Sequence, residues 1–301
     1  MDRKIPLVSI VTPSYNQGRF IEATLLSVKS QDYPNIEHIV IDGGSTDNTT
    51  EVLKRYEKEY NLKWTSGRDK GQSDAINKGF AKASGEIIGW LNSDDVYFDR
   101  QVVSYVVSEF SKLPDTGVVY GDGVIINKDN LVLLVWHTIP YFSFNRLLRL
   151  NVFFQPSCFF RRSVVVENKL DTNMHLSMDY EYYLKIARNG IKFKHVNRLL
   201  SGFRSYETAK STARAKEMRI EGKKIRKLYG CDPDLSYYLL RFLDLVLVTL
   251  SLKIYGVKTM LELHMGYERA NLAFSPRFDS PVRALLRQAL ATRLRSIFNK
   301  Q

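Results

Sequence analysis

Two adjacent carboxylates, Asp94 and Asp95, stand just after the apolar run of residues 86–91. Two like charges this close are costly inside a protein unless a cation or hydrogen-bond donors offset their repulsion. Mg²⁺ and Mn²⁺ prefer hard oxygen ligands, and Mg²⁺ usually binds through one or two carboxylates together with substrate phosphates. A metal ion held here could neutralise a departing diphosphate. The alternative is that both carboxylates cap the turn into a helix that follows Asp99.

Two further carboxylates occupy positions that suit binding or catalysis. Asp42 closes the predicted strand 36–41, and an acidic residue there can accept hydrogen bonds from a ribose or a base in nucleotide-binding α/β folds. Asp179 begins a predicted helix at 179–188, so its carboxylate could be a general base or the cap of that helix. Taken alone, a polar turn residue and a helix cap are the simpler interpretations.

Several common kinds of site are absent from the sequence. Residues 12–18 lack the G-x-G-x-x-G pattern of dinucleotide-binding folds, and no Walker A sequence occurs. The five histidines do not have the spacing of metal ligands. The two cysteines, Cys158 and Cys231, suggest neither a disulfide framework nor a zinc site, and the first residues do not resemble a signal peptide. We therefore expect a reducing, cytoplasmic location.

Alternating strands and helices must position these residues. The predicted strands of the first hundred residues are 7–12, 36–41, 62–65 and 86–91, and the predicted helices are 20–29, 50–60 and 73–83. This alternation indicates βαβ units and a mostly parallel sheet. Ligands bind beyond the carboxyl ends of such strands. The polar clusters at 12–16, 42–47 and 92–95 should therefore share one rim of the sheet.

The pattern changes from about residue 117. Strands are predicted at 118–122, 131–136 and 192–196, with helices near 163 and at 179–188, and mainly helix after 207. This succession indicates a mixed sheet that closes the acceptor side of a cleft.

Five segments, taken in order, resemble the motifs of glycosyltransferase family 2, whose members have the GT-A fold. They are V-S-I-V-T-P-S-Y-N at 8–16, I-D-G-G-S-T-D-N-T at 41–49, D-K-G-Q-S-D-A-I-N-K-G at 69–79, L-N-S-D-D at 91–95 and M-D-Y-E at 178–181. The resemblance covers residues 6–205. It implies an α/β fold with a mixed, mostly parallel sheet flanked by helices. It also implies a catalytic domain at 1–206, with a nucleotide-binding half at 1–98 and an acceptor-side half at 99–206, before a basic helical region at 207–301.

The resemblance implies roles for individual residues as well. Asp179 matches the catalytic base and Asp95 the ligand of an Mg²⁺ or Mn²⁺ ion, whereas Met178 stands where the family often has Glu. Arg204 and Ser211 match positions that often belong to a mobile segment over the donor phosphates. The positions that match donor binding are Thr12, Pro13, Asp42, Asp69, Asn77, Asp94 and Arg204.

A reaction follows from the resemblance. The family transfers a sugar from a nucleotide-sugar donor, here expected to be a UDP-sugar, to a saccharide or a lipid-linked acceptor. Asp179 would take a proton from the acceptor hydroxyl, and a single displacement would invert the anomeric centre. The resemblance also implies that the protein takes part in bacterial surface polysaccharide synthesis.

The basic charge of the chain is concentrated in its last third. Residues 1–200 contain 25 Lys or Arg and 23 Asp or Glu, whereas residues 201–301 contain 19 and 9. The segment 281–301 reads as a basic amphipathic helix, and 242–254 is largely apolar. These segments predict attachment to an anionic membrane surface. The alternative is that they pack on the catalytic domain or form the interface of a homo-oligomer.

Two other functions compete with sugar transfer. A sugar-nucleotide nucleotidyltransferase would need a Gly-rich, basic loop early in the chain, but residues 12–20 contain one Gly and one Arg. A nucleic-acid-binding protein is suggested by the isoelectric point of about 9.5, but it would interleave basic and aromatic residues on one face. The basic excess lies far from the acidic strand ends, so no nucleic-acid partner is expected.

Overall fold

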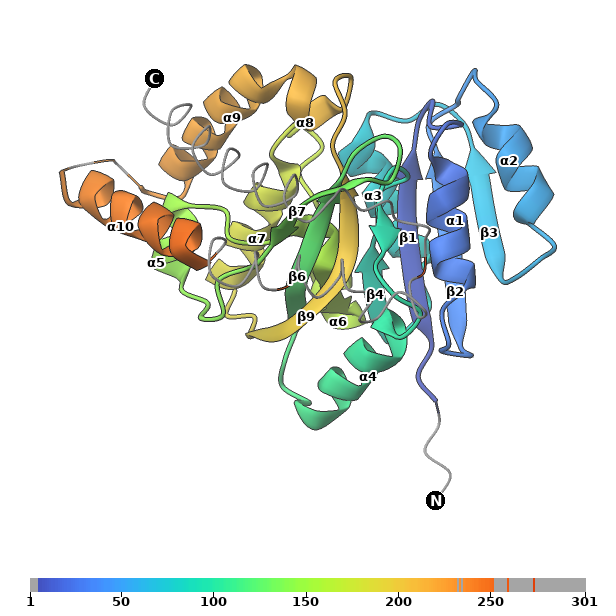
Figure 1. The fold of residues 1–301 in the computed structure, drawn as a ribbon, viewed down its shortest axis with the longest axis horizontal. Coiled ribbons are helices and arrows are strands. Elements are labelled where there is room, and N and C mark those ends of the chain that lie inside the picture. The colour runs from blue at the N-terminus through green and yellow to red at the C-terminus, as the bar shows by residue number, and fades with distance from the viewer. Residues whose placement is uncertain (1–4, 232, 234, 252–258, 260–272, 274–301) are drawn as a thin grey trace.

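The computed structural model describes residues 5–231, 233, 235–251, 259 and 273. Nine strands in this part of the chain form one mixed sheet with helices on both faces (Figure 1). The strands are β1 (Val8–Ser14), β2 (Ile36–Asp42), β3 (Leu62–Ser66), β4 (Ile87–Trp90), β5 (Val96–Tyr97), β6 (Val118–Ile126), β7 (Val132–Trp136), β8 (Cys158–Arg161) and β9 (Phe193–Arg204). The helices are α1 (Ile21–Lys29), α2 (Thr49–Tyr56), α3 (Gln72–Lys82), α4 (Val102–Lys112), α5 (Phe144–Arg149), α6 (Arg162–Glu167), α7 (Met178–Arg188), α8 (Lys210–Ala213), α9 (Ala215–Leu228) and α10 (Leu235–Ser251).

The N-terminal half is the predicted parallel unit. Its strands lie in the order β3-β2-β1-β4, and all three pairings are parallel. Every residue of β1 and β4 is buried, because helices cover both faces of this part of the sheet. α3 packs on one face through Ile76 and Phe80, and α1 and α2 pack on the other through Leu25 and Leu53. The expected alternation of strands and helices is confirmed.

The second half completes the sheet with mixed pairing. β8 pairs antiparallel with β4 and β6, and β6 pairs parallel with β9. The mixed sheet expected from the sequence is therefore confirmed. The strand predicted at 192–196 was too short, because β9 continues to Arg204 through register shifts opposite Gly121 and Asp122. The short β5, which pairs with the end of β9, was not predicted.

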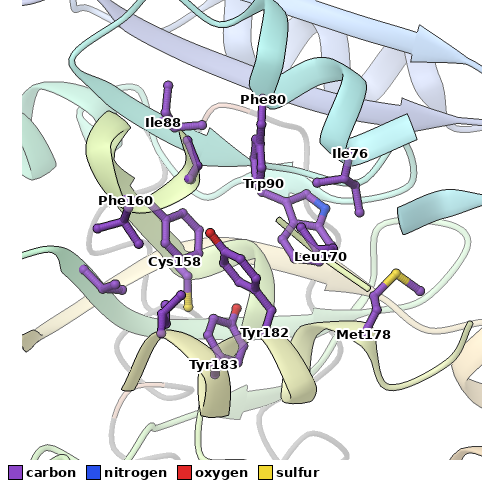
Figure 2. Packing of buried hydrophobic residues seen from close by; sticks show 14 of the residues in the cluster. Ile76, Phe80, Ile88, Trp90, Cys158, Phe160, Leu170, Met178, Tyr182 and Tyr183 are labelled. Carbon is purple, nitrogen blue, oxygen red and sulfur yellow. The ribbon is translucent and has the colours of Figure 1, made fainter. Parts of the chain in front are cut away.

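An aromatic core fixes α7 against the sheet (Figure 2). The ring of Tyr182 lies 6.4 Å from that of Phe80 in α3 and 5.8 Å from that of Phe160 in β8. Phe80 also meets the edge of Trp90, the last residue of β4, at 6.5 Å. Such close-packed rings give little room for α7 to shift. The first turn of α7 is thereby held at a fixed place relative to the end of β4.

The close approach of α3 to β1 gives a stability prediction. A Cβ atom at Gly79 would lie 2.3 Å from Cγ1 of Val11, a completely buried side chain. We expect Gly79→Ala to lower the free energy of unfolding by roughly 1 kcal/mol or more, because overpacking costs about 1–3 kcal/mol and the better helix propensity of Ala returns only part. Urea denaturation measures the change. Gly67→Ala is the control, since a Cβ atom added at Gly67 would have no neighbouring atom within 4 Å. Equal denaturation midpoints for the two variants would contradict the prediction.

The region after residue 207 is helical as far as it is described. α9 contributes Ile225 to the main core, and α10 joins α5 through ion pairs of Asp244 with Arg146 and Arg149. None of the helices in the described part of the chain combines the length and apolar character that crossing a lipid bilayer requires. The segment 281–301, which carries the basic amphipathic pattern, and residues 252–254 lie outside the described residues.

Candidate active site

A large cleft of about 2030 Å³ opens over the carboxyl ends of β1 and β4. Ser14 and Tyr15 line it from the end of β1, and Asn92 and Asp94 line it from the segment after β4. The opposite wall comes from the start of α7 and from α9 and α10. Open α/β sheets bind ligands at this edge, where the strands end and the loops begin. The rim predicted from the sequence therefore borders the main cleft.

The paired carboxylates have different surroundings. Asp94 lines the cleft, and its Oδ2 accepts a hydrogen bond from the Tyr206 hydroxyl at 3.0 Å. Asp95 is only 1% exposed, and its Oδ1 accepts the backbone N–H of Arg204 at 2.9 Å. Burial raises the pKa of both carboxyls, and the charge of Asp94 raises the pKa of Asp95 further. A cation in the cleft would relieve this repulsion.

These carboxylates fit a divalent cation in chemistry, with Asp94 as the one that reaches the cleft. Within the described residues, no three or more His, Cys, Asp or Glu side chains are grouped to hold a metal ion. Mg²⁺ nevertheless needs only one or two carboxylates when substrate phosphates and water supply the other oxygens. The assignment of the metal ligand to Asp95 stays a prediction, and the structure adds Asp94 as the accessible member of the pair.

Arg204 differs from its predicted setting. It ends β9 and is 2% exposed, so it is part of the sheet in this structure. Its guanidinium donates to the carbonyl oxygens of Asp94 at 2.8 Å and Asn127 at 3.0 Å. These bonds hold the acidic turn against β9 through Nε and Nη1 of Arg204. Ser211, the other residue predicted in that segment, lies in α8 and lines the cleft.

Asp179 lines the same cleft from the first turn of α7. Its Oδ2 accepts a long hydrogen bond of 3.4 Å from Asn151 Nδ2. Burial raises the pKa of Asp179, and the charge of Glu221 adds a smaller contribution in the same direction. Backbone N–H groups of Tyr180 and Asp179 itself, together with Asn151, act to lower this pKa, but burial outweighs them. A partly buried carboxylate with a raised pKa is suited to accept a proton.

Glu221 in α9 holds the segment that leads into α7. Its carboxylate accepts the backbone N–H groups of His175 at 3.0 Å, Leu176 at 2.8 Å and Ser177 at 2.5 Å. Burial acts to raise the pKa of Glu221, but the three hydrogen bonds outweigh it, and the pKa lies below 4.5. Glu221 therefore connects the C-terminal helices to the turn that carries Asp179.

We expect Glu221→Gln to lower the free energy of unfolding by about 2 kcal/mol, because a charged acceptor of backbone hydrogen bonds is lost. The pKa of Glu221 is depressed in the folded state, so this stabilisation is present above about pH 4.5 and is lost as the pH falls through the lower folded pKa. Denaturation at pH 7 and at a series of lower pH values measures the loss of stability and its dependence on pH. Glu217→Gln, which breaks only a surface pair with Arg214, is the control. Equal stability of the two variants at pH 7 would contradict the role of Glu221.

The predicted donor-binding residues divide into two groups. Pro13 and Asp69 line the cleft, as do Asp94 and Arg204. Thr12, Asp42 and Asn77 are not among the lining residues, and each has partners within the protein. Thr12 Oγ1 lies 2.9 Å from His38 Nε2, and Asn77 bonds the backbone of Leu170. The donor-binding roles of these three residues stay predictions.

Asp42 organises the loop that follows β2. Its Oδ2 accepts the backbone N–H groups of Gly44 at 3.1 Å and Ser45 at 2.9 Å, and the Ser66 hydroxyl at 2.6 Å. Gly43, which lines the cleft, is part of this loop. Gly44 has a φ of 85°, a conformation that favours glycine. Asp42 therefore shapes the wall of the cleft from behind it.

Sequence reasoning missed an amide network among residues that line the cleft. Asn92 Nδ2 donates to Gln155 Oε1 at 2.9 Å, and Gln155 Nε2 donates to the Trp90 carbonyl at 2.9 Å. Gln72 Nε2 also donates to Asn92 Oδ1 at 3.0 Å. Asn92 could have been found, since it belongs to the N-S-D-D motif. Nothing in the sequence singles out Gln155, because its partners lie about 63 residues away.

The cleft is strongly basic apart from its three aspartates. Among the residues that the structure describes, eleven Lys or Arg side chains line it, compared with Asp69, Asp94 and Asp179. Five of the cations belong to α9, namely Lys216, Arg219, Lys223, Arg226 and Lys227. Such an excess favours an anionic ligand, since clefts with one sign of charge concentrate ligands of the other.

Similarity to known sequences covers this part of the chain. A family model described as glycosyl transferase family 2 matches residues 9–169. Chondroitin synthase of Pasteurella multocida is 30% identical over 197 residues, which are 65% of this chain and 20% of that protein. Poly-beta-1,6-N-acetyl-D-glucosamine synthase of Staphylococcus epidermidis is 34% identical over 137 residues, 45% of this chain and 33% of that protein. The chain thus spans a fifth to a third of the length of these two synthases.

Two solved structures share the fold. TarS of S. aureus, residues 1–349, in complex with UDP-GlcNAc, has a TM-score of 0.61 at 17% identity, covering 77% of this chain and 69% of that one. The mannosyltransferase PcManGT from Pyrobaculum calidifontis, in complex with GDP-Man and Mn²⁺, has a TM-score of 0.60 at 17% identity, covering 99% and 89%. The predicted GT-A fold is confirmed by these likenesses.

Proposed function

The chain belongs to glycosyl transferase family 2, and on that premise we propose that it transfers a sugar from a nucleotide-sugar donor to an acceptor hydroxyl. The observation that carries the proposal is the single cleft that Asp94 and Asp179 both line. Asp94, after the end of β4, is placed to bind a cation, and Asp179, at the start of α7, is placed to accept a proton. Family membership favours this function over a nucleotidyltransferase or a nucleic-acid-binding protein.

The donor we propose is a UDP-sugar. TarS, which shares the fold, is described with UDP-GlcNAc and with UDP. The curated relatives include synthases of chondroitin and of poly-beta-1,6-N-acetyl-D-glucosamine. The proposed product is accordingly part of a bacterial surface polysaccharide. A GDP-sugar is the alternative, since the mannosyltransferase of the same fold is described with GDP-Man.

Asp94 would hold an Mg²⁺ or Mn²⁺ ion at the cleft, and buried Asp95 would add negative charge behind it. When bound, the metal ion supplies positive charge to a departing nucleoside diphosphate. Tyr206 donates its hydroxyl to Asp94 and thereby orients this carboxylate. Arg204 holds the turn of both aspartates through the Asp94 carbonyl and the Asp95 side chain.

Asp179 acts as the general base in this proposal. Its carboxylate accepts the proton of the acceptor hydroxyl while that oxygen attacks the anomeric carbon of the donor. The bond to the diphosphate oxygen breaks on the opposite face, so the anomeric centre inverts. Asn151 orients the carboxylate, and Glu221 holds the turn that presents it. A base of this kind contributes about 10²–10⁴-fold to the rate.

The surroundings of Asp179 predict the pH dependence of activity. Burial raises the pKa of its carboxyl above the ordinary value of 3.8. The base works only when it is deprotonated, so kcat/KM falls as the pH drops through the raised pKa. We expect the acid limb of the profile to lie above pH 3.8, and Asp179→Asn to lack that limb. If the acid limb of the pH profile keeps the same position in Asp179→Asn as in wild type, another group is responsible for the titration.

Release of nucleoside diphosphate tests the proposed function. The protein is incubated with Mn²⁺ and a panel of UDP- and GDP-sugars, with simple glycosides as acceptors, and the free diphosphate is measured. We expect release from a UDP-sugar that requires Mn²⁺ and is slowed by about 10²–10⁴-fold in Asp179→Asn. Equal release by wild type and Asp179→Asn from every donor would contradict the proposal.

A further inference from the structure

We propose that three aromatic side chains on one side of the cleft form a subsite on which a pyranose ring of the acceptor stacks. The inference rests on the proposed function and names the residues that recognise its acceptor. The three side chains are Trp136 at the end of β7, Phe154 between α5 and β8, and Phe203 near the end of β9. All three line the cleft, and we call them the aromatic platform.

Strand pairing places the platform on one face of the sheet. Trp136 of β7 is paired with Gly123 of β6, and Phe203 of β9 is paired with Ile125 of β6. Directly paired residues point to the same face, and so do residues two apart in one strand. Trp136, Ile125 and Phe203 therefore share the face that lines the cleft. The alternate residue Val124 belongs to a core cluster instead.

Gly123 leaves the space that the ring of Phe154 occupies. A Cβ atom at Gly123 would lie 2.1 Å from Cε1 of Phe154. The Phe154 ring stacks against Trp136, with centroids 6.1 Å apart and 26° between the planes, and it meets the edge of Phe203 at 6.1 Å and 68°. Phe154 is 6% exposed, whereas Trp136 and Phe203 are partly exposed. Phe154 thus supports two rings that a ligand can reach.

Buried polar contacts fix the end of β7 that carries Trp136. Asp122 is 2% exposed, and its Oδ2 lies 2.6 Å from Nδ1 of His137, the residue after Trp136. Its Oδ1 accepts the backbone N–H of Thr138 at 2.8 Å. The platform is therefore formed before a ligand arrives, and little affinity is lost to ordering it.

The platform is attached directly to the acidic turn at 92–95. Phe203 precedes Arg204, whose backbone N–H donates to a carboxylate of this turn at 2.9 Å. Phe154 precedes Gln155, whose Oε1 accepts a side-chain N–H of the same turn at 2.9 Å. Two of the three rings thus lie one residue away from a contact with the turn that would hold the metal ion.

The proposed base lies at the other end of the same segment. Asn151, three residues before Phe154, donates to Asp179 at 3.4 Å. The ring of Phe153 lies 4.4 Å from that of Tyr183, one turn of α7 after Asp179. Residues 151–155 therefore connect the base, the platform and the acidic turn.

The position of the platform favours the acceptor over the nucleotide. In the sheet, β1 and β2 lie on one side of β4, and β6 and β9 lie on the other. Ser14 and Gly43 line the cleft from the ends of β1 and β2, and the acidic turn follows β4. A donor with its nucleotide near β1 and its diphosphate at this turn leaves the platform to the acceptor.

The chemistry of the platform favours a sugar ring over a phosphate. The faces of Trp and Phe rings are electron-rich and attract partly positive C–H bonds, such as those on the apolar side of a pyranose. The platform itself carries no charge, so it gives a phosphate no advantage. Ligand sites commonly combine such an apolar surface with a few polar groups, here Asp94 and Asp179 in the same cleft.

Saccharide binding to the full chain with UDP and Mg²⁺ bound tests this inference. Saturation-transfer NMR is carried out with methyl β-glucoside, methyl β-galactoside, cellobiose and N,N′-diacetylchitobiose. We expect at least one of them to bind, and Trp136→Leu and Phe203→Leu each to weaken its binding at least about threefold, since leucine keeps the apolar surface but lacks the flat ring. Trp136→Phe should lose less. Trp64→Leu is the control, because Trp64 is also partly exposed but lies in β3 outside the cleft.

Calorimetry of UDP binding separates the possible failures, and thermal unfolding verifies that each variant folds. If wild type does not bind UDP, the proposed function fails. If UDP binds but none of the four saccharides does, this inference alone fails. Saccharide binding by folded Trp136→Leu and Phe203→Leu that equals wild type would also overturn it. Weaker binding of the UDP-sugar with unchanged saccharide binding in these variants would assign the platform to the donor sugar and overturn the acceptor subsite.

Discussion

Asp179→Asn is expected to reduce kcat by about 10²–10⁴-fold, the contribution that a positioned general base makes to proton transfer. The amide has nearly the same shape as the carboxylate and can keep a hydrogen bond with Asn151, but it cannot accept the proton of the acceptor hydroxyl. Nucleotide affinity should change less than about threefold, because Asp179 contacts the acceptor side in this account. Initial rates of diphosphate release and calorimetry of UDP binding measure the two effects separately.

Glu181→Gln is the matched control for Asp179→Asn. Glu181 lies two residues further along α7, where it pairs with Lys185 and accepts the Tyr229 hydroxyl, and it does not line the cleft. Its replacement should alter stability more than kcat. Asp179→Asn with a rate within threefold of wild type would remove the base from the mechanism. A joint loss of rate and nucleotide affinity would assign Asp179 to the donor side instead.

Asp94→Asn is expected to weaken nucleotide binding in the presence of Mn²⁺ by roughly 100-fold, and to abolish the difference between binding with and without the metal ion. Loss of even an outer-shell partner typically costs about 10–100-fold in metal affinity, and Asp94 is the accessible carboxylate itself. Without metal ion, the variant should bind nucleotide no more weakly than wild type, because repulsion between a carboxylate and the diphosphate is removed. Calorimetry with and without Mn²⁺ gives all four affinities.

Tyr206→Phe and Asp95→Asn separate the contributions around Asp94. Tyr206→Phe removes the hydroxyl that donates to Asp94 but keeps the carboxylate. It should therefore lose far less metal-dependent nucleotide affinity than Asp94→Asn does. Asp95→Asn replaces a buried acceptor of the Arg204 N–H, so it should lower thermal stability as well as metal affinity. If Asp94→Asn keeps full metal-dependent nucleotide binding and a folded Asp95→Asn loses it, the metal ligand is Asp95 alone.

The sequence predicted the elements that carry the site because their patterns are local. The strands that lead to Pro13, Asp42 and Asp94 are rich in apolar and β-branched residues, and parallel topology places their ends on one edge. The first turn of α7 was likewise visible from its helical spacing. The motif at 91–95 identified the acidic turn, but it could not show that Asp94 lines the cleft whereas Asp95 is buried. That difference arises from Arg204, more than a hundred residues away.

Other parts of the site could not be predicted because their causes are tertiary. The final residues of β9 are strand because they pair with β6 across register shifts, a feature without a local signal. The role of Glu221 depends on three backbone donors more than forty residues earlier. The apolar run of α10 was evident, but its inner side is defined by the pairing of Asp244 with Arg146 and Arg149, nearly a hundred residues apart.

Calorimetric titration of the wild-type chain with UDP, GDP, dTDP and ADP, each with and without Mn²⁺, tests most directly the central claim that this cleft binds a nucleotide-sugar donor. The account predicts Mn²⁺-dependent binding of one nucleotide, UDP, with the others weaker. A folded protein that binds none of the four under either condition would contradict the assignment of the donor site to the edge formed by β1 and β4.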